Sequence, residues 1–367
     1  MRRHPNLLLS LVLLTVLSPL NSWAYKPESG HKVLNTVAIK YYNLCANELN
    51  GSFTPALVPI KGTKDDKDSD FGQVLQYNLD EDASIWGFPR RIFNWHFFRA
   101  SIQDRNTFFL GAFDKSMGRM VEGIYEDIVP KDGESNEDYL LTQDDINRLT
   151  GRVMHFVEDT TVPAHVTPVW HGPFVSDEFD SIPVIESKLD MAIDQLFPKI
   201  CHDIKAEILE SNDFKPTEEI TNELINILGV TSEETFNNLE KEACKTKGGE
   251  SHDWTIFWTP PPKEDDGFNL IGKDYFGSYT NCKIAIYKDD ENGKEQTVIK
   301  EVTSYFPQNT CNKPEEDNLT SECKITKSDI EDFVKIQHIN AVKADIKALF
   351  WLSQNILRED RSNEEKN

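Results

Sequence analysis

One apolar stripe near the carboxyl end of the chain restricts the fold more than any other sequence feature. The large apolar side chains of residues 328–357 recur every three or four positions, which is the period of one face of an α-helix. They are Ile336, Ile339, Val342, Ile346, Leu349, Phe350 and Leu352. A single helix cannot bury such a stripe, so other helices must pack against it. The stripe therefore predicts a mainly α, multi-helix protein.

Helical spacing of apolar residues recurs at several places before this stripe. It predicts helices over residues 31–49, 106–128, 184–210, 216–229 and 232–245. Another helix should begin at Thr142, because Thr-Gln-Asp-Asp supplies an N-cap hydroxyl followed by early acidic residues. It should end near Thr160, before Pro163. Residues 50–80 carry Gly, Pro and a run of charged residues, which predicts an exposed loop.

The composition changes between about residues 250 and 325. Three consecutive prolines at 260–262 and two acidic Gly/Asn turns accompany alternating segments at 282–287 and 297–302, which predict a small β hairpin. We expect a helical domain over 25–250, an insertion over 251–325 that contains the hairpin and three cysteines, and a helix over 326–367 that rejoins the helical domain. The aromatic group of Trp254, Phe257 and Trp258 predicts either a lipid-contact loop or a buried staple under the insertion.

Residues 1–24 are typical of an export signal. Two arginines precede an apolar run at 7–17, and Ser22-Trp23-Ala24 has the small-x-small character of a signal peptidase site. The run is too short for a permanent anchor, and no later stretch approaches the roughly 20 apolar residues of a transmembrane helix. We therefore expect a soluble monomer that is secreted to the extracellular space or the periplasm.

Cysteine content and charge restrict the chemistry. All six cysteines follow the signal, and an even number in an exported chain favours disulfides, although the sequence does not give their pairing. None forms a CxxC pair, so any metal must be held by histidines and carboxylates. The net charge of −23 becomes about −25 without the two arginines of the signal. Such a surface repels polyanions, so no nucleic-acid partner is expected.

Histidines and carboxylates gather at the end of the predicted helix over 142–160. His155 and Asp159 are four residues apart, which places them on one helix face, close enough to share a metal ion. The chain can turn after Pro163 and bring His165 back towards the same pocket. Further candidates follow at His171, Asp177, Glu178 and Asp180. Such mixed ligands suit a hydrolytic zinc site, because zinc binds imidazole and carboxylate and keeps a position open for water.

The string from His155 to His165 has the pattern H-x3-D-x3-P-x-H, and it resembles the signature of the zinc-dependent phospholipase C and S1/P1 nuclease superfamily. The resemblance covers about residues 25–250 and the last helix, and implies an all-helical fold that holds up to three zinc ions. Such proteins supply an aspartate and, about 14 residues later, a histidine among aromatics. Here Asp82 precedes His96 by 14 residues, within Asn94-Trp-His-Phe-Phe98.

The resemblance also implies how the ligands divide between two zinc ions. One ion would be held by Asp82, His96, His155 and Asp159. The second would share Asp159 with His31 of the first helix and with the amino-terminal residue of the mature chain. Cleavage after Ala24 would make that residue Tyr25, which we prefer, whereas members of the superfamily usually begin at a tryptophan, which would be Trp23.

The third zinc is where the chain departs from the superfamily pattern. That site is usually closed by the histidine matching His165 and by a later His-x3-Glu or His-x3-Asp pair, but Val175 stands four residues after His171. We expect His171 and Asp180 to act as ligands after the turn at 172–173. The alternatives are Asp177 or Glu178 as ligands, or a site with two zinc ions.

The activity implied by the resemblance is that of a phospholipase C. It would hydrolyse phospholipids such as phosphatidylcholine to diacylglycerol and a phosphorylated head group, with zinc-activated water oriented by Asp82. One alternative is a nuclease or 3'-nucleotidase on the same scaffold, against which the acidic charge counts, because the basic strip over 90–105 is short. Another is an inactive secreted binding protein that contains metal.

Overall fold

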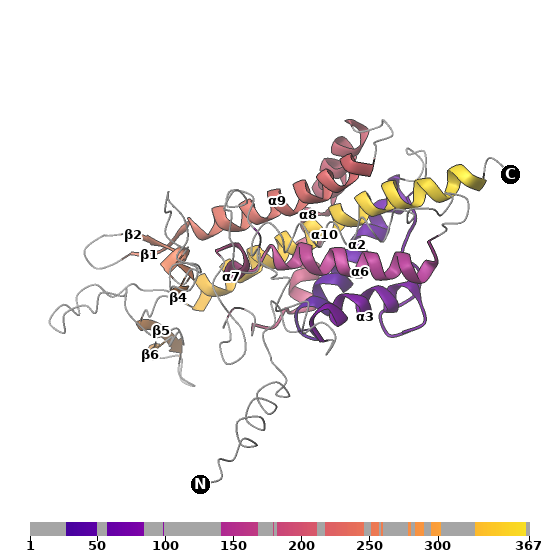
Figure 1. Cartoon of the computed structure of the whole chain (residues 1–367). Helices are drawn as coiled ribbons and strands as arrows, with labels where there is room; N and C mark the ends of the chain where they lie inside the picture. The colour runs from indigo at the N-terminus through magenta and orange to yellow at the C-terminus, as the bar shows by residue number, and fades with distance from the viewer. Residues whose placement is uncertain are drawn as a thin grey trace, which may run out of the picture.

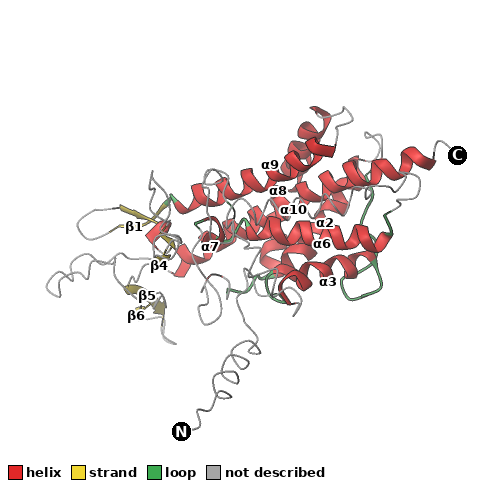
Figure 2. Ribbon diagram, in the orientation of Figure 1, coloured by secondary structure: helices red, strands yellow, loops and turns green. Residues whose placement is uncertain are grey.

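A computed structural model describes thirteen parts of the chain. They are residues 27–49, 57–83, 98, 141–167, 179, 182–210, 217–245, 251–256, 258–259, 278–279, 283–289, 295–301 and 327–364. Within them the chain is mainly helical, as predicted (Figures 1 and 2). The helices are α2 (His31–Leu49), α3 (Asp70–Ala83), α6 (Gln143–Asp159), α7 (Pro163–Val166), α8 (Glu186–Glu210), α9 (Thr217–Leu239) and α10 (Lys327–Glu364).

The long helix α10 packs against α2, α6, α8 and α9, so most of the helical core forms around it (Figure 1). Its buried face contains most of the predicted stripe, including Val342, Ile346 and Leu349. Ile336 is an exception and is exposed, because Phe333 and Val334 occupy the buried face at that end of the helix.

Helix α6 begins as predicted. The Thr142 hydroxyl accepts a hydrogen bond from the backbone N–H of Asp145, and the Asp145 carboxylate accepts one from the backbone N–H of Thr142. This reciprocal pair satisfies two of the donors that a helix leaves unpaired at its amino end. The helix ends at Asp159, so His155 and Asp159 lie in its last turns, close to the start of α7.

The predicted loop over 50–80 is wrong from residue 70 onward, where α3 begins. The charged run at 64–68 does form an exposed turn, but Val74 and Leu75 are buried and give the next segment an apolar face. That face packs on α6, which in turn contacts α10, so α6 lies between the two helices (Figure 1). Local charge therefore hid a helix whose stability comes from its packing.

The two helices predicted over 216–229 and 232–245 are one helix, α9, followed by a strand. Leu224, Leu228 and Phe236 lie buried on a face that continues through Gly229. The hydroxyls of Thr231 and Ser232 donate to backbone carbonyls one turn earlier, which satisfies these polar groups without ending the helix. The helix predicted over 106–128 lies outside the described residues.

The described strands form three antiparallel pairs. They are β1 (Glu242–Lys245) with β2 (Ser251–Asp253), β3 (Trp258–Thr259) with β4 (Ser278–Tyr279), and β5 (Lys283–Asp289) with β6 (Glu295–Glu301). The last pair runs in register from Lys283 opposite Glu301 to Asp289 opposite Glu295, and it is the predicted hairpin. Trp254 and Trp258 are buried and stack on Phe333 of α10, which fits the staple rather than the lipid-contact loop.

A disulfide joins α2 to α8 through Cys45 and Cys201, whose Cα atoms lie 5.7 Å apart. The expectation of disulfides is thus confirmed for one pair, which lies in the helical part of the chain. Cys282, Cys311 and Cys323, in the predicted insertion, lie outside the described residues. Among the described helices, none combines the length and the apolar character that crossing a membrane requires.

Candidate metal centre

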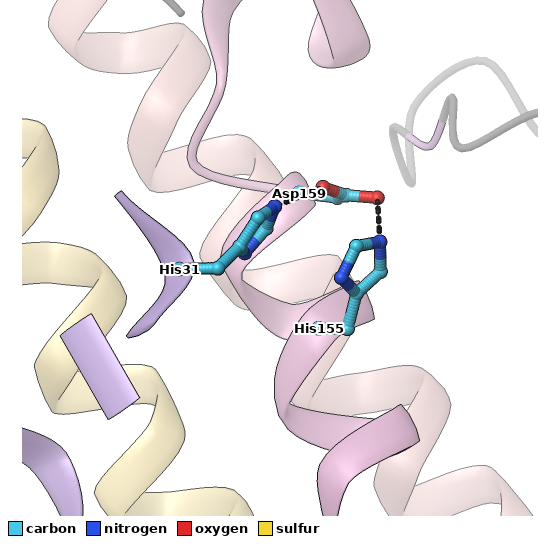
Figure 3. A group of neighbouring side chains, drawn as sticks. All are labelled: His31, His155 and Asp159. Carbon is cyan, nitrogen blue, oxygen red and sulfur yellow. Dashed lines mark ion pairs between the residues drawn. The ribbon is translucent and has the colours of Figure 1, made fainter. Parts of the chain in front are cut away.

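Three buried side chains from two helices meet beside the start of α7 (Figure 3). His31 is the first residue of α2, and His155 and Asp159 lie one turn apart at the end of α6. One potential ligand atom from each of them lies within 4.8 Å of the others. Because His155 and Asp159 are four residues apart on a helix, they share the face that α2 approaches. These three residues are called the metal centre below.

The distances within the metal centre suit a shared ion better than direct hydrogen bonds. His155 Nε2 lies 3.5 Å from Asp159 Oδ2, and His31 Nε2 lies 3.9 Å from Asp159 Oδ1. Hydrogen bonds of this kind are usually about 2.7–3.2 Å long. Ligand atoms about 2.1 Å from a tetrahedrally coordinated ion stand roughly 3.4 Å apart. The donors therefore fit a metal ion, and none of the three side chains is exposed.

The two oxygens of Asp159 face different imidazoles. Oδ1 faces His31, whereas Oδ2 faces His155 (Figure 3). The rings of these histidines stack, with centroids 4.4 Å apart and planes 25° from parallel. Protonating both rings would place two positive charges in this small buried space, whereas metal ligation uses neutral imidazoles. A carboxylate in this position can bridge two ions or bind one.

His165 lies next to the metal centre. Pro163 begins the short helix α7, and His165 follows two residues later with its side chain buried. Its Nδ1 atom lies 3.8 Å from Asp159 Oδ2. The backbone N–H of Phe98 donates to the carbonyl of His165, which ties residue 98 to α7. The turn between α6 and α7 thus adds a third imidazole beside the same carboxylate.

Sequence reasoning missed Glu158, which lies behind the metal centre and is fully buried. Its Oε2 atom is 2.5 Å from His31 Nδ1. The side-chain amides of Asn35 and Asn78 donate to Oε1 and Oε2 over 2.8 and 3.2 Å, respectively. No signal in its own segment separates Glu158 from an ordinary exposed glutamate of a helix, because its burial comes from the packing of other helices on α6.

Asp345 of α10 is a second buried acid that the sequence did not reveal. Burial raises the pKa of Asp345 well above its usual range, and the negative charge of Glu158 raises it further. These effects favour the neutral, protonated form of the Asp345 carboxyl beside Glu158.

The other predicted ligands are not placed in the metal centre. Asp82 lies in α3, and nothing is described of its side chain. Its neighbour Glu81 pairs with Arg152 of α6 over 2.9 Å. The remaining candidates lie outside the described residues: Trp23, Tyr25, His96, His171, Asp177, Glu178 and Asp180.

Two imidazoles and one carboxylate, with a third imidazole adjacent, form a donor set suited to a transition metal rather than to calcium or magnesium, which prefer oxygen ligands. Its burial means that a bound ion would lie in surroundings of low dielectric constant, where its charge acts strongly. No protein-family model, curated protein or solved structure matches the chain.

Proposed function

We propose that this protein is a secreted zinc-dependent phosphodiesterase of the phospholipase C type, acting on zwitterionic phospholipids such as phosphatidylcholine. The observation that carries the proposal is the buried Asp159, whose two carboxylate oxygens face His31 on one side and His155 on the other. Zinc is the favoured metal because its hydrolytic sites combine imidazole and carboxylate ligands.

The residues in and beside the metal centre would have different roles. His31, His155 and Asp159 would hold the ion, and His165 adjoins them for a further ion or for the substrate phosphate. When bound, zinc supplies a Lewis acid for a phosphoryl oxygen and lowers the pKa of water to near 7. Burial of the three side chains excludes bulk water from their hydrogen-bonding atoms, which keeps their geometry fixed during the reaction.

The charge of the chain favours the phospholipid over the nucleic acid as substrate. The net charge is −23, and a polyanion approaching such a surface meets long-range repulsion. The head group of phosphatidylcholine is zwitterionic, so it meets no comparable repulsion. Hydrolysis on the glycerol side of the phosphate would release diacylglycerol and phosphocholine.

The test is a two-substrate assay of the zinc-loaded mature protein, with and without a chelator. Phosphatidylcholine vesicles and single-stranded DNA serve as substrates, and bound zinc is measured in every sample. We expect phosphocholine release that the chelator abolishes. DNA cleavage alone would replace the proposal with the nuclease, and neither activity in zinc-loaded protein would leave a metal-containing binding protein.

Two variants attribute the activity to the metal centre. His155→Gln removes a ligand and should abolish both zinc binding and phosphocholine release. His202→Gln makes the same chemical change at a histidine of α8 whose side chain is 81 % exposed, and it should leave both unchanged. Full activity in the His155→Gln protein would rule out this site.

A further inference from the structure

The two ring nitrogens of His31 have different surroundings. Nε2 faces Asp159 across 3.9 Å, on the side of the metal centre. Nδ1 faces away from it and lies 2.5 Å from the Glu158 carboxylate. Both partners come from the end of α6, so one imidazole is held between two consecutive carboxylates of the same helix.

The Glu158 carboxylate is itself held in place. Asn35, one turn after His31 on α2, donates to Glu158 Oε1 and also to the backbone carbonyl of His31. Asn78 of α3 donates to Oε2. Glu158, Asn35 and Asn78 are all fully buried, so these hydrogen bonds do not compete with water.

The hydrogen bonds determine which nitrogen of His31 carries the proton. An ionised carboxylate only accepts hydrogen bonds, so a carboxylate 2.5 Å from Nδ1 requires a proton on that nitrogen. Neutral imidazole carries one proton, which leaves the lone pair on Nε2, the atom that faces Asp159. Partners of this kind orient metal-binding histidines and make them better ligands.

We propose that Glu158 is the positioning residue of His31, fixing the Nδ1–H tautomer and the ring orientation that present Nε2 to a metal ion. This inference rests on the metal centre of the proposed function. Helices α2, α3 and α6 thus each contribute to the placement of one ligand.

The decisive variant is Glu158→Gln, which keeps the shape of the side chain and removes its charge. An amide whose NH2 group faces Nδ1 would move the proton of His31 to Nε2 and block ligation, and an amide oxygen there would be a weaker acceptor. We expect the zinc affinity, measured by competition with a chelating dye, to fall about 10- to 100-fold. Glu186→Gln is the matched control, because it removes a surface carboxylate that pairs with Lys64, and it should bind zinc like the wild type.

Nitrogen-15 NMR of the histidine rings reads the tautomer directly in zinc-free protein. The His31 signals are assigned by their loss in His31→Gln, and in the wild type they should show the Nδ1–H form. In Glu158→Gln the population should shift towards Nε2–H. A wild-type His31 that carries its proton on Nε2 would overturn the proposal even if the variant did not fold.

The outcomes separate this inference from the proposed function. Wild-type protein that binds no zinc would remove the metal centre, and with it both proposals. Zinc binding that His155→Gln abolishes but Glu158→Gln leaves unchanged would keep the metal centre and contradict the role of Glu158.

Discussion

Asp159 is the residue that connects all three imidazoles around the metal centre, because its two oxygens face His31, His155 and His165. The spacing of His155 and Asp159 on one helix was sufficient to predict that these two meet. The part played by Glu158 could not be predicted, because a glutamate in a helix is ordinarily exposed, and here the approach of α2, α3 and α10 buries it.

A bound zinc ion should stabilise the folded protein. A ligand that binds only the folded state at 100 times its dissociation constant adds about 2.7 kcal/mol to the free energy of unfolding. We expect zinc to raise the melting temperature of the wild type and of His202→Gln, and to leave that of Asp159→Asn unchanged. Calorimetry with and without zinc checks this, and an equal shift in Asp159→Asn would place the metal elsewhere.

His338 should make stability depend on pH below neutrality. Burial lowers its pKa from 6.5 to about 4, so the unfolded chain takes up a proton at a pH where the folded protein does not. The contribution of His338 is therefore fully present above pH 6.5 and is lost as the pH falls towards 4. The total loss is about 3 kcal/mol.

Denaturant unfolding at pH 7.5, 5.5 and 4.5, with chelator present, isolates the contribution of His338. His338→Phe, which keeps an aromatic ring beside Phe179, should lack the part of the pH dependence that belongs to residue 338. Identical pH profiles for the wild type and this variant would contradict the prediction. They would show that the His338 imidazole takes up its proton at the same pH in the folded protein and in the unfolded chain.

At the scale of elements, the bounds of a helix were predicted correctly where its own sequence contains a capping residue at the start and a helix-breaking residue after the end. Helix α6 has the capping pair at Thr142 and a proline beyond its end, and both bounds were predicted. Helix α3 has a local start at Ser69, whose hydroxyl accepts a hydrogen bond from the backbone N–H of Gly72, but the charged run at 64–68 favoured a loop in the prediction. The merging of two predicted segments into α9 depends on buried residues on both sides of Gly229. The existence of α3 and the continuity of α9 depend on packing against other helices. A short window of sequence does not show which distant residues a segment packs against.

Gly151 shows how closely α3 and α6 approach. A Cβ atom at this position would lie 2.5 Å from the Val74 carbonyl oxygen and 2.7 Å from the Asn78 backbone nitrogen. Gly→Ala inside a helix ordinarily stabilises by about 1 kcal/mol. Here we expect Gly151→Ala to lower the free energy of unfolding by about 1–3 kcal/mol. The atoms that the added methyl group would meet belong to the backbone of α3, which cannot move aside as a flexible side chain can.

Chemical denaturation of Gly151→Ala gives the sign of this effect, and a gain in stability would mean that α3 can move away from α6 freely. Zinc affinity is a second measurement on the same protein. Asn78 donates to Glu158, so a displaced α3 should weaken zinc binding as well.

At the scale of the molecule, the disulfide joins residues 156 positions apart and links the helix that carries His31 to α8. Replacing both Cys45 and Cys201 by alanine should lower the free energy of unfolding by about 2–5 kcal/mol, because the unfolded chain regains the freedom of a long loop. Unfolding of the oxidised wild type, the reduced wild type and the double variant tests this. An oxidised wild type no more stable than the double variant would contradict it.

The sequence predicted the helical class, the long helix near the carboxyl end, the hairpin and the cluster around His155. It could not show that Asn35, Asn78 and Asp345 converge on Glu158, because these residues are tens to hundreds of positions apart and each looks unremarkable in its own segment. Only the arrangement of four helices brings them together.

The position of α10 in the chain has a consequence for the order of folding. This helix of 38 residues, roughly 57 Å long, is synthesised after every other helix described, yet it packs against α2, α6, α8 and α9. Those helices cannot close their common core before it emerges. A nascent chain should therefore stay open to proteases and chaperones until synthesis reaches α10, and competence to bind metal should appear as one of the last events of folding.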